Sequence, residues 1–146
     1  MLRNDLINQD QHPKITKPKT TTSISTPLLI TMAYTITWQK NCITWHYSGV
    51  LTGEDLLNSN FELFGDERFD DIRYQIVDLT AVEKVEATKN HMRKIAHLDM
   101  AAARSNPRVK IAVVTTSTDG QFLSNTYDRY IEGKSPWSTQ VFATLT

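Results

Sequence analysis

The second half of the chain has two nearly continuous apolar runs, 74–79 and 109–114, on either side of an amphipathic segment of helical period. A strand that is apolar on both faces is typical of a parallel sheet covered by helices, and a connection of this length suits one crossover helix. The stretch from Arg73 to Thr116 therefore predicts a strand–helix–strand unit. This unit places the chain in the α/β class.

The stretch before this unit follows a period of two. Aromatic and aliphatic residues alternate with polar ones over 34–39 and again over 42–47, on either side of Lys40-Asn41. Two alternating runs joined by a short polar turn predict an antiparallel hairpin with its aromatic face buried. We expect Gly49 to close this hairpin.

Capping residues, glycines and prolines give the limits of three helices. A final strand is predicted over 139–145. The resulting order, β-β-α-β-α-β-α-β, predicts a mixed, mostly parallel sheet with an N-terminal antiparallel hairpin and helices packed on it. The predicted helices begin at Thr52, Thr88 and Thr118, and they end before Gly65, at Asn106-Pro107 and before Gly133.

The first 32 residues differ in character from the rest. The segment 1–31 contains three of the 5 prolines and no aromatic residue, and its four basic and two acidic side chains give it a charge of +2. Such a composition cannot offset the entropy of ordering the chain. We expect 1–32 to be a disordered tail or a non-native extension, with Met32 as an alternative start, and 33–146 to form a single domain.

Composition excludes several classes of function. The 146 residues carry 16 basic and 16 acidic side chains, without the basic excess that nucleic-acid binding requires. No apolar run approaches the roughly 20 residues of a membrane span. A lone cysteine, Cys42, fits a reducing compartment, so we expect a cytoplasmic protein.

No motif in the chain names a reaction. His91 and His97 are six residues apart and do not share a helix face, and no histidine or cysteine spacing resembles a zinc site. There is no nucleophile elbow and no glycine-rich phosphate loop. We therefore predict no metal, no cofactor and no catalytic residue.

Two acidic residues are candidate ligand contacts. Asp78 ends a buried strand, where open α/β sheets bind ligands, although capping the following loop is the commoner role. Asp99 falls within the apolar stripe of the second helix, where an ionised carboxylate is costly unless it is paired. A structural ion pair with Arg104 or Arg108, or a backbone cap, is the expected solution for Asp99, with a ligand contact as the alternative.

Aromatic residues gather around the third helix. Core packing accounts for most of them, but rings left exposed beside the last strand would mark a surface for a partner or an apolar ligand. The group consists of Phe122, Tyr127, Tyr130 and Trp137.

The chain resembles the SpoIIAA-like branch of the STAS superfamily. The resemblance rests on the order of elements and on three stretches: I-V-D-L-T (76–80), A-A-A-R-S-N-P-R-V-K-I-A-V-V (101–114) and Y-I-E-G-K-S-P-W (130–137). That superfamily includes the anti-sigma-factor antagonists, and the branch shares its general shape with the lipid-carrying CRAL-TRIO domains. The resemblance covers 33–146. Members usually continue into a final helix, which this chain lacks after 141–142.

The resemblance also points to Thr88. The antagonists carry a phosphorylated serine in an Asp-Ser-Ser-Gly motif at a helix start, and Glu86-Ala87-Thr88-Lys89 occupies the matching place. Only an acid and one hydroxyl remain, so Thr88 is expected to act as a helix cap, with a phosphosite as the alternative.

Three functions follow from these observations. The first is a non-catalytic regulatory or protein-interaction module of the STAS type that binds a protein partner or self-associates. The second is a small carrier of an apolar ligand; a cavity of a few hundred Å³ lined by Phe61, Phe64, Tyr127 and Tyr130 would favour it, and a filled core would favour the module. The third is an enzyme of unknown class.

Overall fold

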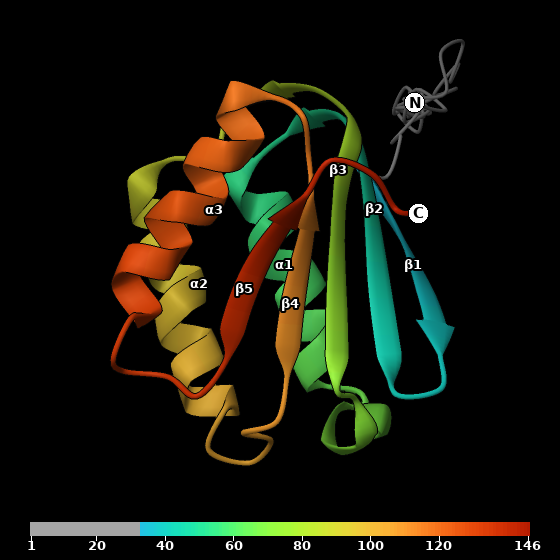
Figure 1. Cartoon of the computed structure of the whole chain (residues 1–146), viewed down its shortest axis with the longest axis vertical. Coiled ribbons are helices and arrows are strands. Elements are labelled where there is room, and N and C mark those ends of the chain that lie inside the picture. Colours follow the sequence, from blue (N-terminus) through green and yellow to red (C-terminus); the bar gives the residue numbers. More distant parts are fainter. Residues whose placement is uncertain (1–32) are drawn as a thin grey trace, which may run out of the picture. The chain divides into compact units, whose positions relative to one another are not determined.

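The computed structural model describes residues 33–146, so the predicted tail 1–32 lies outside the described residues. The described part is a five-stranded sheet with three α-helices and one short 3₁₀ helix, η1 (Figure 1). The predicted α/β class and the order of its elements are confirmed. The elements are β1 Tyr34–Gln39, β2 Cys42–Leu51, α1 Gly53–Phe64, η1 Glu67–Asp71, β3 Tyr74–Val85, α2 Lys89–Ala102, β4 Lys110–Val114, α3 Thr118–Ile131 and β5 Ser138–Phe142.

The N-terminal hairpin forms as the alternating pattern predicts. β1 and β2 pair antiparallel, and Asn41 takes a positive φ of 60° in the turn between them. The antiparallel pairing ends just before Gly49, as predicted, with Tyr34 opposite Tyr47, but β2 itself continues to Leu51 beside β3. Gly49 has a φ of 65° and lies between two shifts in the β2–β3 register. Its conformational freedom therefore bends the strand rather than ending it.

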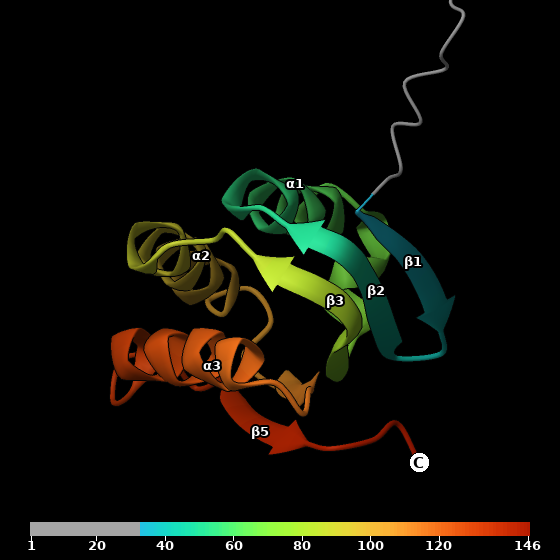
Figure 2. The same ribbon diagram turned by 90° about the horizontal axis from the view of Figure 1, so that it is seen from above.

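The strands lie in the sheet in the order in which they occur in the chain, β1-β2-β3-β4-β5, and β2 to β5 are parallel. Each of the three crossovers thus steps in the same direction across the sheet. Crossovers of one hand that step in one direction place their helices on one face. Figure 2 shows this arrangement, with α1, α2 and α3 all on the same side of the curved sheet.

The other face, called here the open face, is covered by no helix of residues 33–146. β3 and β4 are adjacent and parallel as predicted, with Val77 opposite Val113 and Ile76 opposite Ala112. Val113 is buried, whereas Ile76 is only half-buried. The apolar runs are continuous because the open face also carries some aliphatic residues, not because helices cover it.

Side-chain caps begin all three helices. Thr52 accepts a hydrogen bond from the Asp55 amide and completes the predicted capping box. α3 is capped by Ser117, whose hydroxyl accepts from the Gly120 amide, and not by Thr118 as predicted. The last strand also ends earlier than predicted, at Phe142.

The core lies between the helix layer and the sheet. Its largest fully buried apolar side chains are Ile43, Leu51, Leu63, Ile72 and Val109.

Candidate functional site

Thr88 is the N-cap of α2. Its hydroxyl accepts a hydrogen bond from the His91 amide at 3.4 Å, and its own amide donates to Nδ1 of His91 at 3.0 Å. His91 also faces the start of α1, where a Cβ added to Gly53 would lie 2.1 Å from the ring. The cap therefore joins the first turns of two helices, and glycine is needed at position 53 because the ring occupies that space.

Asp78 lies in the interior of β3, seven residues before the strand ends, and not at its end as predicted. One of its carboxylate oxygens accepts from the amide and hydroxyl of Thr80, at 3.0 and 2.7 Å, and the other lies 2.9 Å from Nδ1 of His46. Burial raises the pKa of Asp78, but the bonds from Thr80 and His46 outweigh it, and the net pKa is lowered. His46 is marked in the sequence only by its place in an alternating strand.

The surroundings of Asp78 do not form a ligand crevice of the usual α/β kind. Open sheets bind ligands where the strand order reverses. Here the order never reverses, so the described sheet has no such point. The His46–Asp78 pair instead joins β2 to β3 beside the register shift that follows His46.

Asp99 is buried and paired, but not with the predicted cation. Tyr127 on α3 donates its hydroxyl hydrogen to Oδ2 of Asp99 at 2.7 Å, and Arg104 is exposed and forms no ion pair with it. Burial raises the pKa of Asp99 to about 7, partly opposed by the hydrogen bond from Tyr127. The prediction of an ion pair is therefore wrong, because a neutral donor from a neighbouring helix reaches Asp99.

The aromatic residues around α3 do not form one surface. Tyr127 and Trp137 are buried, Tyr130 is half-buried, and Phe122 is exposed. The Trp137 indole donates to the backbone oxygen of Asn106 at 2.7 Å, so its polar atom is satisfied within the core.

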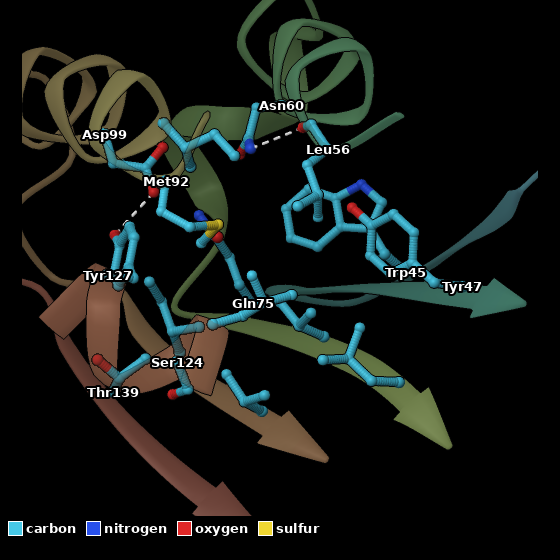
Figure 3. Close-up of a pocket in the computed structure, with 16 residues that line it drawn as sticks. Trp45, Tyr47, Leu56, Asn60, Gln75, Met92, Asp99, Ser124, Tyr127 and Thr139 are labelled. Carbon is cyan, nitrogen blue, oxygen red and sulfur yellow. Dashed lines mark hydrogen bonds between the residues drawn. The ribbon is translucent and has the colours of Figure 1, made fainter. Parts of the chain in front are cut away.

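A cavity of about 70 Å³ lies between the sheet and the helices (Figure 3). Tyr127 lines it, but Phe61, Phe64 and Tyr130, which were named for a carrier cavity, do not. The volume is well below the few hundred Å³ that a carrier cavity would need. The core is therefore not completely filled, and its cavity is too small to hold a lipid chain.

A shallow groove runs between α1 and α2 on the helix side of the molecule. Phe61 is 56% exposed there, although it belongs to the apolar side of α1. An exposed ring of this size beside other apolar residues is the surface feature that accompanies partner binding. The groove is lined by Leu57, Phe61, Arg93, Lys94, His97, Leu98 and Ala101.

The rim of this groove is basic. The ion pairs within residues 33–146 are His46–Asp78, Arg68–Asp66 and Lys84–Glu86, so Arg93 and Lys94 have no carboxylate partner among them. Arg93 instead donates to the side-chain oxygen of Asn90 at 2.7 Å. Both cations are exposed on α2.

Within the described residues, no group of three or more histidine, cysteine, aspartate or glutamate side chains has the arrangement of a metal site. None of the helices in 33–146 has the length and apolar character needed to cross a membrane.

The chain is similar to two solved structures. One is an uncharacterized protein of the DUF3478 family with a SpoIIAA-like fold from Shewanella loihica, 15% identical, with 77% of this chain and 85% of that chain covered and a TM-score of 0.44. The other is the anti-sigma factor antagonist SpoIIAA in its unphosphorylated form, 9% identical, with 75% and 90% covered and a TM-score of 0.45.

Both structures are SpoIIAA-like, the group that the sequence resembles. No protein-family model matches the chain, and no curated protein matches it.

Proposed function

We propose that this protein is a non-catalytic interaction module, and that its groove between α1 and α2 binds an amphipathic helical segment of a partner protein with acidic residues beside its apolar face. The observation that carries this proposal is the exposure of Phe61 in a groove whose α2 side carries Arg93 and Lys94, neither of which has a carboxylate partner within residues 33–146. A helix laid in a groove presents apolar anchors at positions i, i+3, i+4 and i+7. Leu57 and Phe61, one turn apart, supply the apolar floor for such anchors.

Charge selects among the occupants of the groove. A second copy of the chain bound face to face would bring Arg93 and Lys94 against the same cations, which is unfavourable. The segment 1–31 carries a net charge of +2 and would be repelled as well. An acidic partner gains attraction at the rim and apolar burial at the floor, so it is the occupant that fits both features.

We also propose a cytoplasmic location. Cys42 is the single cysteine of the chain and has a free thiol, so no intramolecular disulfide can form. A reducing compartment suits such a chain.

The test uses the full chain and two synthetic helical peptides with the same apolar pattern, one with glutamate and one with lysine at the flanking positions. Fluorescence anisotropy should show saturable binding of the acidic peptide that weakens as salt is added. Phe61→Ser should weaken binding about tenfold or more, because a central aromatic anchor commonly contributes that much. Lys94→Glu should also weaken binding of the acidic peptide.

Matched variants lie outside the groove. Phe122 is likewise an exposed phenylalanine, on α3, so Phe122→Ser should leave the affinity unchanged, and so should Lys134→Glu beyond the end of α3. Equal losses for Phe61→Ser and Phe122→Ser, or a preference for the basic peptide, would overturn the proposal. So would a dimer that Phe61→Ser dissociates, or a gain in peptide affinity when 1–31 is removed, since each assigns the groove to another occupant.

A further inference from the structure

Asp99 and Tyr127 form a polar contact between two helices. The Tyr127 hydroxyl on α3 donates to Oδ2 of Asp99 on α2 at 2.7 Å, and Figure 3 shows this bond. No other side-chain hydrogen bond and no ion pair joins α2 to α3 within residues 33–146. The polar connection between these helices therefore depends on the state of one carboxyl group.

The surroundings of Asp99 suit a neutral carboxyl group. Its second oxygen, Oδ1, is buried and has no hydrogen-bond partner within residues 33–146, and the buried Nε2 of Gln75 has none either. A buried carboxylate is normally paired with a cation or satisfied by several donors. Tyr127 is a single neutral donor. The site thus holds a protonated Asp99 at lower cost than an ionised one.

No charged group compensates an ionised Asp99 from the other elements. The interior cavity beside Asp99 is lined by no lysine, arginine or histidine, and its other titratable groups are two phenols, Tyr47 on β2 and Tyr127 on α3. Burial raises the pKa of both phenols, so both stay neutral. The acidic groups beside these phenols, Asp55 and Asp128, oppose a further negative charge.

Water in the cavity cannot replace a cation. The cavity of about 70 Å³ is partly open and has room for about two water molecules. Its exposed wall is almost entirely apolar, so these waters would find few hydrogen-bond partners there. A carboxylate with so little hydration remains costly. Ionised Asp99 is adequately hydrated only when α2 and α3 part and bulk water reaches it.

The helix placed to move is α3. It connects β4 to β5, and β5 is an edge strand of the described sheet with β4 as its single neighbour. Thr139 of β5 donates to Asp128 on α3, which links these two elements to each other. A helix of 14 residues is only marginally stable without packing. Once released from α2, α3 therefore unfolds locally while β1 to β4 stay paired.

We propose that the contact between Asp99 and Tyr127 is a proton-dependent latch, in which the protonated carboxyl group holds α3 on α2 and loss of the proton releases α3. The latch does not involve the groove between α1 and α2. It adds a local opening of the native protein to the groove, and it stands or fails independently of partner binding.

The direction of the pH effect follows from proton binding. In the closed state, burial raises the pKa of Asp99 to about 7, whereas in the opened state Asp99 is in water, where an aspartate has a pKa of about 3.9. The closed state therefore binds more protons between these values. The opening constant, the ratio of opened to closed molecules, rises between about pH 4 and pH 7 and is level outside that range. Three pKa units correspond to a rise of about 1000-fold. Acidification thus locks α3 in place.

Native-state hydrogen exchange of the ¹⁵N-labelled full chain tests the latch. The exchange rate of each amide, divided by its intrinsic rate at the same pH, gives its opening constant. Amides of β2, which lies between two other strands, report global unfolding. Amides of α3 should have opening constants about tenfold or more above those of β2 at each pH. The α3 values should rise by up to about 1000-fold from pH 4 to pH 7.

Two variants test the latch residues. Asp99→Asn keeps the shape and an acceptor for Tyr127 but cannot ionise, so the opening of α3 should no longer depend on pH. Tyr127→Phe serves as the second variant if Asp99→Asn does not fold. The bond from Tyr127 lowers the pKa of Asp99, so its loss should extend the rise in opening to higher pH. Asp70→Asn, at an exposed position, should keep the original profile.

Equal opening constants for α3 and β2 would overturn the proposal, because α3 would then be released only by global unfolding. A pH-independent opening of α3 in the unaltered chain would overturn it as well. So would a pH dependence that persists in Asp99→Asn, since another group would then control the opening. Phe61→Ser, in the groove, should leave the profile unchanged, and a profile that becomes level in Phe61→Ser would likewise count against a separate latch.

Discussion

At the scale of single residues, Asp99 is a carboxylic acid removed almost entirely from water. The residue is 3% exposed, its carboxyl group accepts one hydrogen bond from Tyr127, and it forms no ion pair within residues 33–146. Ionisation in such a place is unfavourable, which is why burial raises the pKa to about 7. The folded state therefore holds a proton on Asp99 over a pH range in which the unfolded chain has already lost it.

This difference predicts how stability depends on pH. The unfolded pKa is about 3.9, so between about pH 4 and pH 7 the folded state binds more protons, and the free energy of unfolding falls as pH rises. The full loss is on the order of 4 kcal/mol, from about three units at 1.36 kcal/mol each. Asp99→Asn should remove this fall in urea titrations at several pH values. Asp70→Asn, at an exposed position, should retain it, and a slope unchanged in Asp99→Asn would show that Asp99 ionises normally.

Contacts between residues close together in the chain could be predicted from the sequence. Contacts between residues far apart in the chain could not. Thr52 and Asp55 are three residues apart, and this spacing predicted the cap of α1 correctly, whereas the same spacing placed the cap of α3 one residue too late, at Thr118 and not Ser117. Asp99 and Tyr127 are 28 residues apart and meet only through the packing of α2 on α3. Gln75 was hidden as one polar residue within an apolar run, and its unsatisfied amide became visible only when the sheet placed it inside.

Thr88 itself shows how two roles can compete for one oxygen. Its hydroxyl accepts the first-turn amide of His91, although at 3.4 Å, and its side chain is exposed. A phosphate there would keep acceptor oxygens at a helix N-terminus and add about −1.5 to −2 charges, which the helix dipole tolerates. The structure shows Thr88 as a helix cap. Phosphorylation of Thr88 stays a prediction that rests on the family resemblance alone.

At the scale of elements, the one-sided helix layer separates the two faces of each central strand. Period-two alternation assigns Val77 and Val113 to the helix face, and Ile76 and Ala112 to the open face. The sequence predicted the strands and their parallel pairing correctly. It did not predict the open face, because a strand with aliphatic residues on both sides has the same sequence pattern whether or not a second helix layer is present.

The two faces should respond differently to truncation. Val113→Ala should cost about 2 kcal/mol of unfolding free energy, because it removes fully buried carbon atoms. Ile76→Ala removes more atoms but from a half-buried side chain, so we expect about 1 kcal/mol or less. Both replaced residues are β-branched, which keeps the change in strand propensity similar. Urea unfolding measures both costs, and a larger loss for Ile76→Ala than for Val113→Ala would mean that something covers the open face.

At the scale of the whole molecule, the described residues 33–146 form a five-stranded sheet, three α-helices and a hydrophobic core between them. The composition of 1–31, with three prolines and no aromatic residue, offers little to such a core. We therefore predict that a chain beginning at Met32 unfolds at the same urea midpoint as the full chain. A loss above about 1 kcal/mol, a common cost for removing a contact, would show instead that the segment contributes to the fold.

The strand order has a consequence for how the protein acquires its structure. Because the sheet follows the order of the chain, every strand after the first is synthesised when its neighbour already exists, and no strand must wait for a later one to separate it from its partner. Loop closures are then short, and short closures favour rapid folding. The sheet can grow strand by strand from the hairpin as the chain leaves the ribosome. Until β5 is made, however, β4 is an unpaired edge with Ile111 and Val113 on it, and such an apolar edge exposes the nascent chain to aggregation.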